Sequence, residues 1–86
     1  MNNIELFNEG MKMIDVDTTK AFEYFSKSAE AGNADAMYYL GLIYELGDGA
    51  EMNVNKALEW FEKAKALGNM MACVKLGLAY DKDGFA

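Results

Sequence analysis

The sequence predicts an all-α fold, a right-handed α/α superhelix or solenoid of about five antiparallel helices that form two and a half helical-hairpin repeats. Apolar residues recur at helical rather than strand spacing along the chain. Proline is absent, so the eight glycines supply the breaks between helices. The pentapeptide Leu-Gly-Leu-Ile-Tyr at residues 40–44 returns as Leu-Gly-Leu-Ala-Tyr at residues 76–80. A chain of 86 residues forms one domain at most, here residues 1–86.

The first two predicted helices are amphipathic. One covers residues 3–14, and the other begins after Asp17 and runs to about residue 31. The Asp17 carboxylate can accept hydrogen bonds from the free amides of the first turn. Gly32 ends the second helix, because glycine adopts the left-handed conformation of a helix end without a Cβ clash.

The third predicted helix, residues 34–46, is apolar on nearly every side. Such a helix is either sandwiched between others or left for a partner. Asn33 precedes this helix as its cap, and Asn53 does the same for a fourth helix at residues 54–67. Gly68 and Asn69 repeat the stop and cap of Gly32 and Asn33, and a fifth helix follows at about residues 70–82.

An internal repeat organises these helices. Residues 20–46 align without a gap on residues 56–82, and twelve of the 27 positions are identical. Chance would give about two. A period near 36 residues with one helical hairpin per unit is typical of an α-solenoid. We expect units at about residues 17–52 and 53–84, with the first helix as a degenerate half-repeat in which Gly10 takes the role of Gly41.

Two glycines of the repeat, Gly41 and Gly77, lie inside predicted helices. Glycine at such a position costs about 1 kcal/mol relative to alanine. Its repetition therefore predicts that the backbone of a neighbouring helix approaches closely at both positions. Gly77→Leu is accordingly expected to overpack the contact and to cost about 1–3 kcal/mol.

Two motifs resemble a known family. The octapeptide Ala-Leu-Glu-Trp-Phe-Glu-Lys-Ala at residues 57–64 and the Leu-Gly-Leu-Ala-Tyr motif are similar to the Sel1-like repeat, a subclass of tetratricopeptide-like solenoids. The Gly-Asp-Gly loop that leads from residue 47 to Lys-Ala at 56–57 also resembles its signature, with Ala50 and Asn53 replacing the usual valine and aspartate. The ordinary tetratricopeptide repeat is the alternative, but its loop and period are shorter. The resemblance covers residues 17–84.

The resemblance implies a non-catalytic protein-interaction module, a scaffold or adaptor. In the family the Leu-Gly helices line the concave face and bind a protein or peptide segment. Carried over by position, the partner-binding candidates are Asp35, Tyr38, Leu42 and Glu45 on the third helix, and Met71, Val74, Leu78 and Asp81 on the fifth. The alternative for these positions is packing against neighbouring helices.

Two other functions remain open. The fifth helix carries few charges, so the chain could form a homodimer through residues 70–82. The net charge of −6 also permits a small acidic inhibitor of a basic protein partner. The same charge, with eight lysines scattered among fourteen carboxylates, makes nucleic acid and anionic membranes poor partners.

Catalytic chemistry finds little support in the sequence. Histidine is absent, so a serine or cysteine nucleophile has no ordinary base. Cys73 is the single cysteine and aligns with Met37, which predicts a buried core thiol rather than a metal or redox site. We therefore expect no catalytic residue, metal or cofactor. A secretory signal is not expected at the start of the chain, and a single cysteine fits a reducing compartment, so the predicted location is cytoplasmic.

Overall fold

The computed structural model describes residues 1–81, with side chains as far as Leu78. The helices of this part are α1 (Asn3–Met13), α2 (Thr18–Glu30), α3 (Ala34–Leu46), α4 (Val54–Ala66) and α5 (Met70–Asp81). Their bounds agree with the predicted helices to within one residue at each end. Residue 82, the predicted end of the fifth helix, lies outside the described residues.

Asparagine and aspartate side chains begin the helices as predicted. The Asp17, Asn33, Asn53 and Asn69 side chains each accept a hydrogen bond from the backbone N–H three residues later, at 2.8–3.1 Å. Gly32 and Gly68, which follow α2 and α4, have φ angles of +99° and +93° and so adopt the left-handed backbone that stops a helix. The sequence reading missed the cap of α1, where Asn2 and Glu5 bond reciprocally to each other's backbone N–H.

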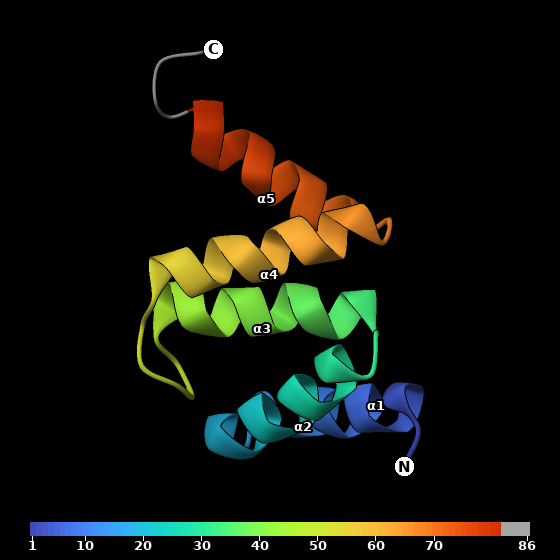
Figure 1. Cartoon of the computed structure of the whole chain (residues 1–86). Coiled ribbons are helices and arrows are strands. Elements are labelled where there is room, and N and C mark those ends of the chain that lie inside the picture. The colour runs from blue at the N-terminus through green and yellow to red at the C-terminus, as the bar shows by residue number, and fades with distance from the viewer. Residues whose placement is uncertain (82–86) are drawn as a thin grey trace.

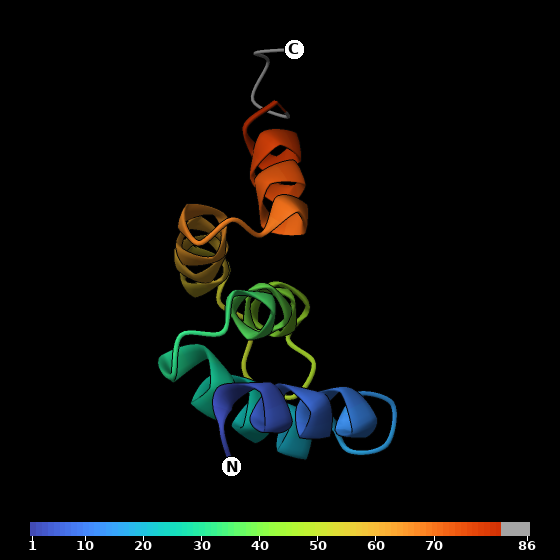
Figure 2. The same ribbon diagram turned by 90° about the vertical axis from the view of Figure 1, so that its right-hand side faces the viewer.

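The helices stack in chain order, each packed against the one before and the one after it. Figure 1 shows the stack, from α1 and α2 at one end to α5 at the other, with α3 and α4 running in opposite directions between them. In the turned view, α3 and α5 lie on the same side of α4 (Figure 2). The dimensions of 42 × 24 × 17 Å reflect this elongated arrangement. The predicted all-α solenoid is confirmed.

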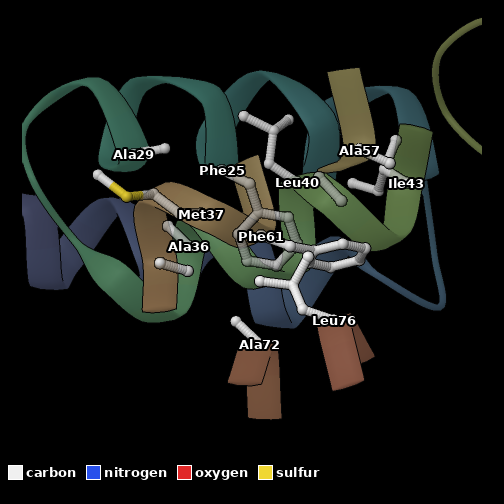
Figure 3. Packing of buried hydrophobic residues seen from close by; sticks show 12 residues of the cluster. Phe25, Ala29, Ala36, Met37, Leu40, Ile43, Ala57, Phe61, Ala72 and Leu76 are labelled. Carbon is white, nitrogen blue, oxygen red and sulfur yellow. The ribbon is translucent and has the colours of Figure 1, made fainter. Parts of the chain in front are cut away.

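The core is built from small residues and two phenylalanines. Phe25 of α2 and Phe61 of α4 are 0% and 2% exposed, and the alanines four residues before them are equally buried. Figure 3 shows Phe25 and Phe61 within one cluster of buried side chains that includes Leu40 of α3 and Leu76 of α5. Because α3 lies between α2 and α4, its nearly continuous apolar surface is covered on two sides, which is the first of the two arrangements that the sequence left open.

The helix-interior glycines have a different neighbour from the one predicted. A Cβ added to Gly10 would lie 2.6 Å from Cε1 of Phe25, and one added to Gly41 would lie 2.5 Å from Cε1 of Phe61. The group that approaches is therefore an aromatic ring and not a helix backbone. At Gly77 no described atom lies within 4 Å of such a Cβ. The prediction that Gly77→Leu overpacks a helix contact is therefore wrong for the described part of the fold.

The prediction of a buried thiol is also wrong, because Cys73 is exposed. Its counterpart Met37, one turn before Gly41, is 7% exposed in α3, which packs against both α2 and α4. No described helix covers the corresponding side of α5. The alignment identified the position within the repeat correctly, but burial there depends on the next helix of the stack.

Candidate functional site

A cavity of about 200 Å³ opens where the end of α1, the start of α2 and the second half of α3 meet. Most of its lining side chains are apolar, and two are carboxylates. The lining residues are Ile14, Asp15, Thr18, Ala21, Tyr39, Leu42, Ile43, Leu46 and Asp48. None of them is basic.

The loop after α3 shapes one wall of this cavity. Gly47 adopts a left-handed conformation with φ +70°, and its N–H donates to the Ile43 carbonyl at 2.8 Å, so α3 ends there and the chain turns back. Gly49, with φ +105°, then lies against the start of α2, where an added Cβ would be 2.5 Å from the Thr18 carbonyl oxygen. Glycine is required at this contact for both reasons, and the contact holds Asp48 at the rim.

The cavity is graded from a buried floor to an exposed rim. Ala21 and Ile43 are 0% and 7% exposed and form the floor. Leu42 is half-buried, whereas Leu46 at the end of α3 is 70% exposed. An incoming apolar side chain could cover Leu46 and Leu42 together, and the exposed Asp15 and Asp48 carboxylates would lie beside it.

The four candidates on α3 have separate surroundings. Asp35 accepts a hydrogen bond at 2.8 Å from the Asn69 amide, which ties the start of α3 to the start of α5. Glu45 forms an ion pair at 2.8 Å with Lys75 of α5. Only Leu42 lines the cavity.

The fourth candidate, Tyr38, takes part in packing. Its ring is half-buried and lies 5.9 Å from the Phe61 ring and 5.3 Å from the Tyr39 ring, centroid to centroid. The two roles considered for these positions were partner binding and packing against neighbouring helices. The ring contacts of Tyr38 agree with the second role.

The candidates on α5 form a separate exposed surface. Met71, Val74 and Leu78 are 55%, 54% and 61% exposed. Asp81 is the last residue of α5, and its side chain lies outside the described part of the structure. None of these residues lines the 200 Å³ cavity.

The sequence reading missed Leu46, Ile14 and Tyr39 as lining residues. No signal in the sequence identified Leu46, because its exposure depends on where the loop after Gly47 folds back.

Two further observations limit the chemistry of the described residues. Among the side chains that the structure describes, residues 1–78, no cluster of three or more cysteine or carboxylate groups could hold a metal ion. None of the helices α1–α5 combines the length and the hydrophobicity that crossing a bilayer requires.

The chain matches known repeats in sequence and in structure. The family model of the Sel1 repeat matches residues 5–33 and 34–69. The crystal structure of a Sel1 repeat protein from Oxalobacter formigenes superposes with a TM-score of 0.86 at 33% sequence identity, over 90% of this chain. The match covers 24% of that protein, so the present chain spans about a quarter of its length. No curated protein matches the sequence.

The matched repeats pair α1 with α2 and α3 with α4. The predicted units at residues 17–52 and 53–84 divide the same array half a hairpin later, and that division stays a prediction. Sel1 repeats are generally protein-interaction modules. With both repeats matched across most of its length, the chain belongs to the Sel1 repeat family.

Proposed function

We propose that this chain is a non-catalytic scaffold or adaptor module that binds a protein or peptide segment on the concave face of its Leu-Gly helices. The cavity beside Leu42 is the anchor point of this face. The observation that carries the proposal is a largely apolar cavity of about 200 Å³ that opens between two exposed carboxylates.

The size of the cavity supports a side chain as its occupant. Small-molecule and cofactor sites usually measure about 300–1,000 Å³. A cavity of roughly 150 Å³ is enough for one benzene molecule. The space beside Leu42 therefore suits one leucine, methionine or phenylalanine side chain of a bound segment.

The charges at the rim favour a basic residue next to that anchor. Asp15 and Asp48 border the cavity, and the whole chain carries a net charge of −6. Attraction of this kind mainly raises the association rate, and salt screens it. Apolar anchoring is expected to persist at about 0.5 M salt, whereas a purely electrostatic acidic inhibitor of a basic protein would lose its binding there.

A peptide selection tests the proposal. Peptides selected from a random display library on the immobilised protein are expected to share a large apolar residue beside lysine or arginine. Leu46→Ser should weaken their binding about tenfold or more, because burying a leucine side chain contributes about 1.5–3 kcal/mol. Fluorescence anisotropy with labelled peptide measures the affinity.

Leu67→Ser is the matched control, since Leu67 is a similarly exposed leucine, at 57%, outside the cavity. It should leave binding unchanged. Equal losses in Leu46→Ser and Leu67→Ser, or a selection without an apolar consensus, would argue against the cavity as the anchor.

Homodimer formation through residues 70–82 is the second candidate. It is favoured by the exposed apolar side chains of Met71, Val74 and Leu78. Size-exclusion chromatography with light scattering separates the two candidates, because a monomer at tens of micromolar contradicts the dimer and leaves the cavity proposal standing.

A further inference from the structure

Each core phenylalanine lies between two helices that carry an interior glycine, α1 and α3 for Phe25 and α3 and α5 for Phe61. The Phe25 ring lies against Gly10 of α1 on one side and stacks on Tyr39 of α3 on the other, with ring centroids 5.3 Å apart and an interplanar angle of 14°. The Phe61 ring lies against Gly41 of α3, and the Lys75 ammonium of α5 is 5.9 Å from its centroid. Lys75 occupies the repeat position of Tyr39, 36 residues later.

The glycine side of the two rings is built in the same way. An aromatic residue stands three positions before the glycine, Phe7 before Gly10 and Tyr38 before Gly41. The Phe7 and Phe25 centroids are 5.8 Å apart at 48°, and the Tyr38 and Phe61 centroids are 5.9 Å apart at 43°. This pair of contacts defines a phenylalanine socket that occurs twice, once on α1 and once on α3.

The α5 helix carries the same positions a third time. Gly77 aligns with Gly41, and Val74 stands three residues before it. A Cβ on Gly77 would have no described atom within 4 Å, and Val74 is 54% exposed. Cys73, one turn before Gly77, is exposed, whereas its counterpart Met37, one turn before Gly41, is 7% exposed. The socket on α5 is therefore open within the described structure.

We propose that this open socket, formed by Cys73, Val74 and Gly77, binds a phenylalanine on an amphipathic helix that another Sel1-type repeat supplies. The two occupied sockets define the chemistry of the occupant. Both bound helices place a buried alanine four residues before the phenylalanine, as Ala21 precedes Phe25 and Ala57 precedes Phe61. The proposal concerns a different surface from the cavity beside Leu42 and does not depend on it.

A folded second copy of this chain does not fit the socket as well. Its own Phe25 and Phe61 are 0% and 2% exposed, so neither can leave its site without unfolding that copy. The occupant is accordingly a helix whose phenylalanine is still free. A dimer in which two α5 helices pack face to face would not need the space above Gly77. Substitution of Gly77 therefore distinguishes such a dimer from a phenylalanine bound in the socket.

Gly77→Ala is the variant that tests the socket. No described atom meets the new Cβ, so the fold should be kept. The same Cβ at Gly41 would lie 2.5, 2.7 and 3.0 Å from three atoms of the Phe61 ring, so a ring bound in the same way above Gly77 would be displaced. Alanine should therefore block the occupant while leaving the free protein intact.

The first experiment uses a synthetic peptide of residues 53–69, which contains α4 and its flanking caps, as the probe. Saturating peptide should slow the reaction of Cys73 with a thiol reagent, because a helix bound over Gly77 would lie one turn from Cys73, as Phe61 of α4 lies over Gly41, one turn from the buried Met37. A Phe61→Ala peptide, or the Gly77→Ala protein, should bind about tenfold or more weakly, because the buried phenylalanine side chain is removed in the first case and displaced in the second.

An extended chain covers the case in which so short a peptide is too weakly helical to bind. Replacing residues 82–86 by a copy of residues 46–69 places an α4 helix after α5 at high effective concentration. Cys73 in this variant should react at least about tenfold more slowly than in the parent chain, and Gly77→Ala should restore the parent rate.

The proposal is overturned if Cys73 of the extended chain reacts as fast as in the parent. It is equally overturned if Gly77→Ala leaves the protection unchanged. Light scattering gives a third result that would overturn the proposal. A dimer that forms equally well in the parent protein and in Gly77→Ala would mean that a second copy covers α5 without using the socket.

Discussion

The two repeated glycines Gly41 and Gly77 should respond in opposite directions to the same substitution. Both lie inside helices at equivalent repeat positions, so alanine brings each the same gain in helix propensity, about 1 kcal/mol. The structure gives them different surroundings. At Gly41 the new Cβ would meet the buried Phe61 ring, and at Gly77 it would meet no described atom within 4 Å.

The magnitude follows from the distances at Gly41. Three ring atoms of Phe61 would lie 2.5–3.0 Å from the Cβ, whereas ordinary contact is about 3.5–4.0 Å. The ring must therefore move by about 1 Å. Phe61 is 2% exposed and has little space to move into. Overpacking of this kind costs about 1–3 kcal/mol.

The propensity gain is common to both variants, so the difference between them isolates the steric cost. Gly77→Ala should raise the free energy of unfolding by about 1 kcal/mol. The free energy of unfolding of Gly41→Ala should be lower than that of Gly77→Ala by about 1–3 kcal/mol. Urea unfolding followed by circular dichroism measures both values, and in thermal unfolding each kcal/mol corresponds to about 4–8 °C in Tm for a chain of this size.

A third variant identifies the ring as the cause. Adding Phe61→Leu to Gly41→Ala removes the aromatic atoms that meet the Cβ, so the two substitutions should be coupled favourably by about 1 kcal/mol or more in a double-mutant cycle. Equal stabilisation by Gly41→Ala and Gly77→Ala would refute this account, and so would strict additivity of the Gly41 and Phe61 substitutions.

The remaining predictions concern the helix caps and the thiol. Asn69→Asp keeps the cap but sets a carboxylate against Asp35, so it should lower Tm more than Asn33→Asp, whose amide faces the neutral Asn3. The difference in Tm between the two variants should become smaller when the salt concentration is raised from about 0.05 to 0.5 M, because salt screens the repulsion. A Tm difference that does not change with salt would contradict a charge effect. Cys73 should react with a thiol reagent in the folded protein without denaturant, and a reaction that waits for global unfolding would contradict its exposure.

Much of the fold could be predicted from the sequence because its determinants are local. Asparagine and aspartate caps act within three residues, and Gly32 and Gly68 stop helices through their own φ angles. Hydrophobic periodicity and the repeat of 36 residues then determine the helices and their order. These signals need no knowledge of distant contacts, which is why helix bounds agreed to within a residue.

The candidate site was less accessible to sequence reasoning. Of the predicted residues on α3, Leu42 lines the cavity, whereas Tyr38 packs on Phe61. Leu46 was missed because its exposure depends on where the loop after Gly47 folds back. Sequence periodicity says which side of a helix a residue occupies, but the neighbours of that side are set by helix packing.

The sequence by itself determined an all-α array of capped helices and the Gly41 and Gly77 positions within it. Only the tertiary structure decided what those positions contact. Gly41 meets a phenylalanine ring, whereas Gly77, with the same local sequence, faces no described neighbour. Met37 and Cys73 differ in burial for the same reason. In a solenoid each helix is buried by the next, so identical repeat positions acquire different environments from their place in the stack.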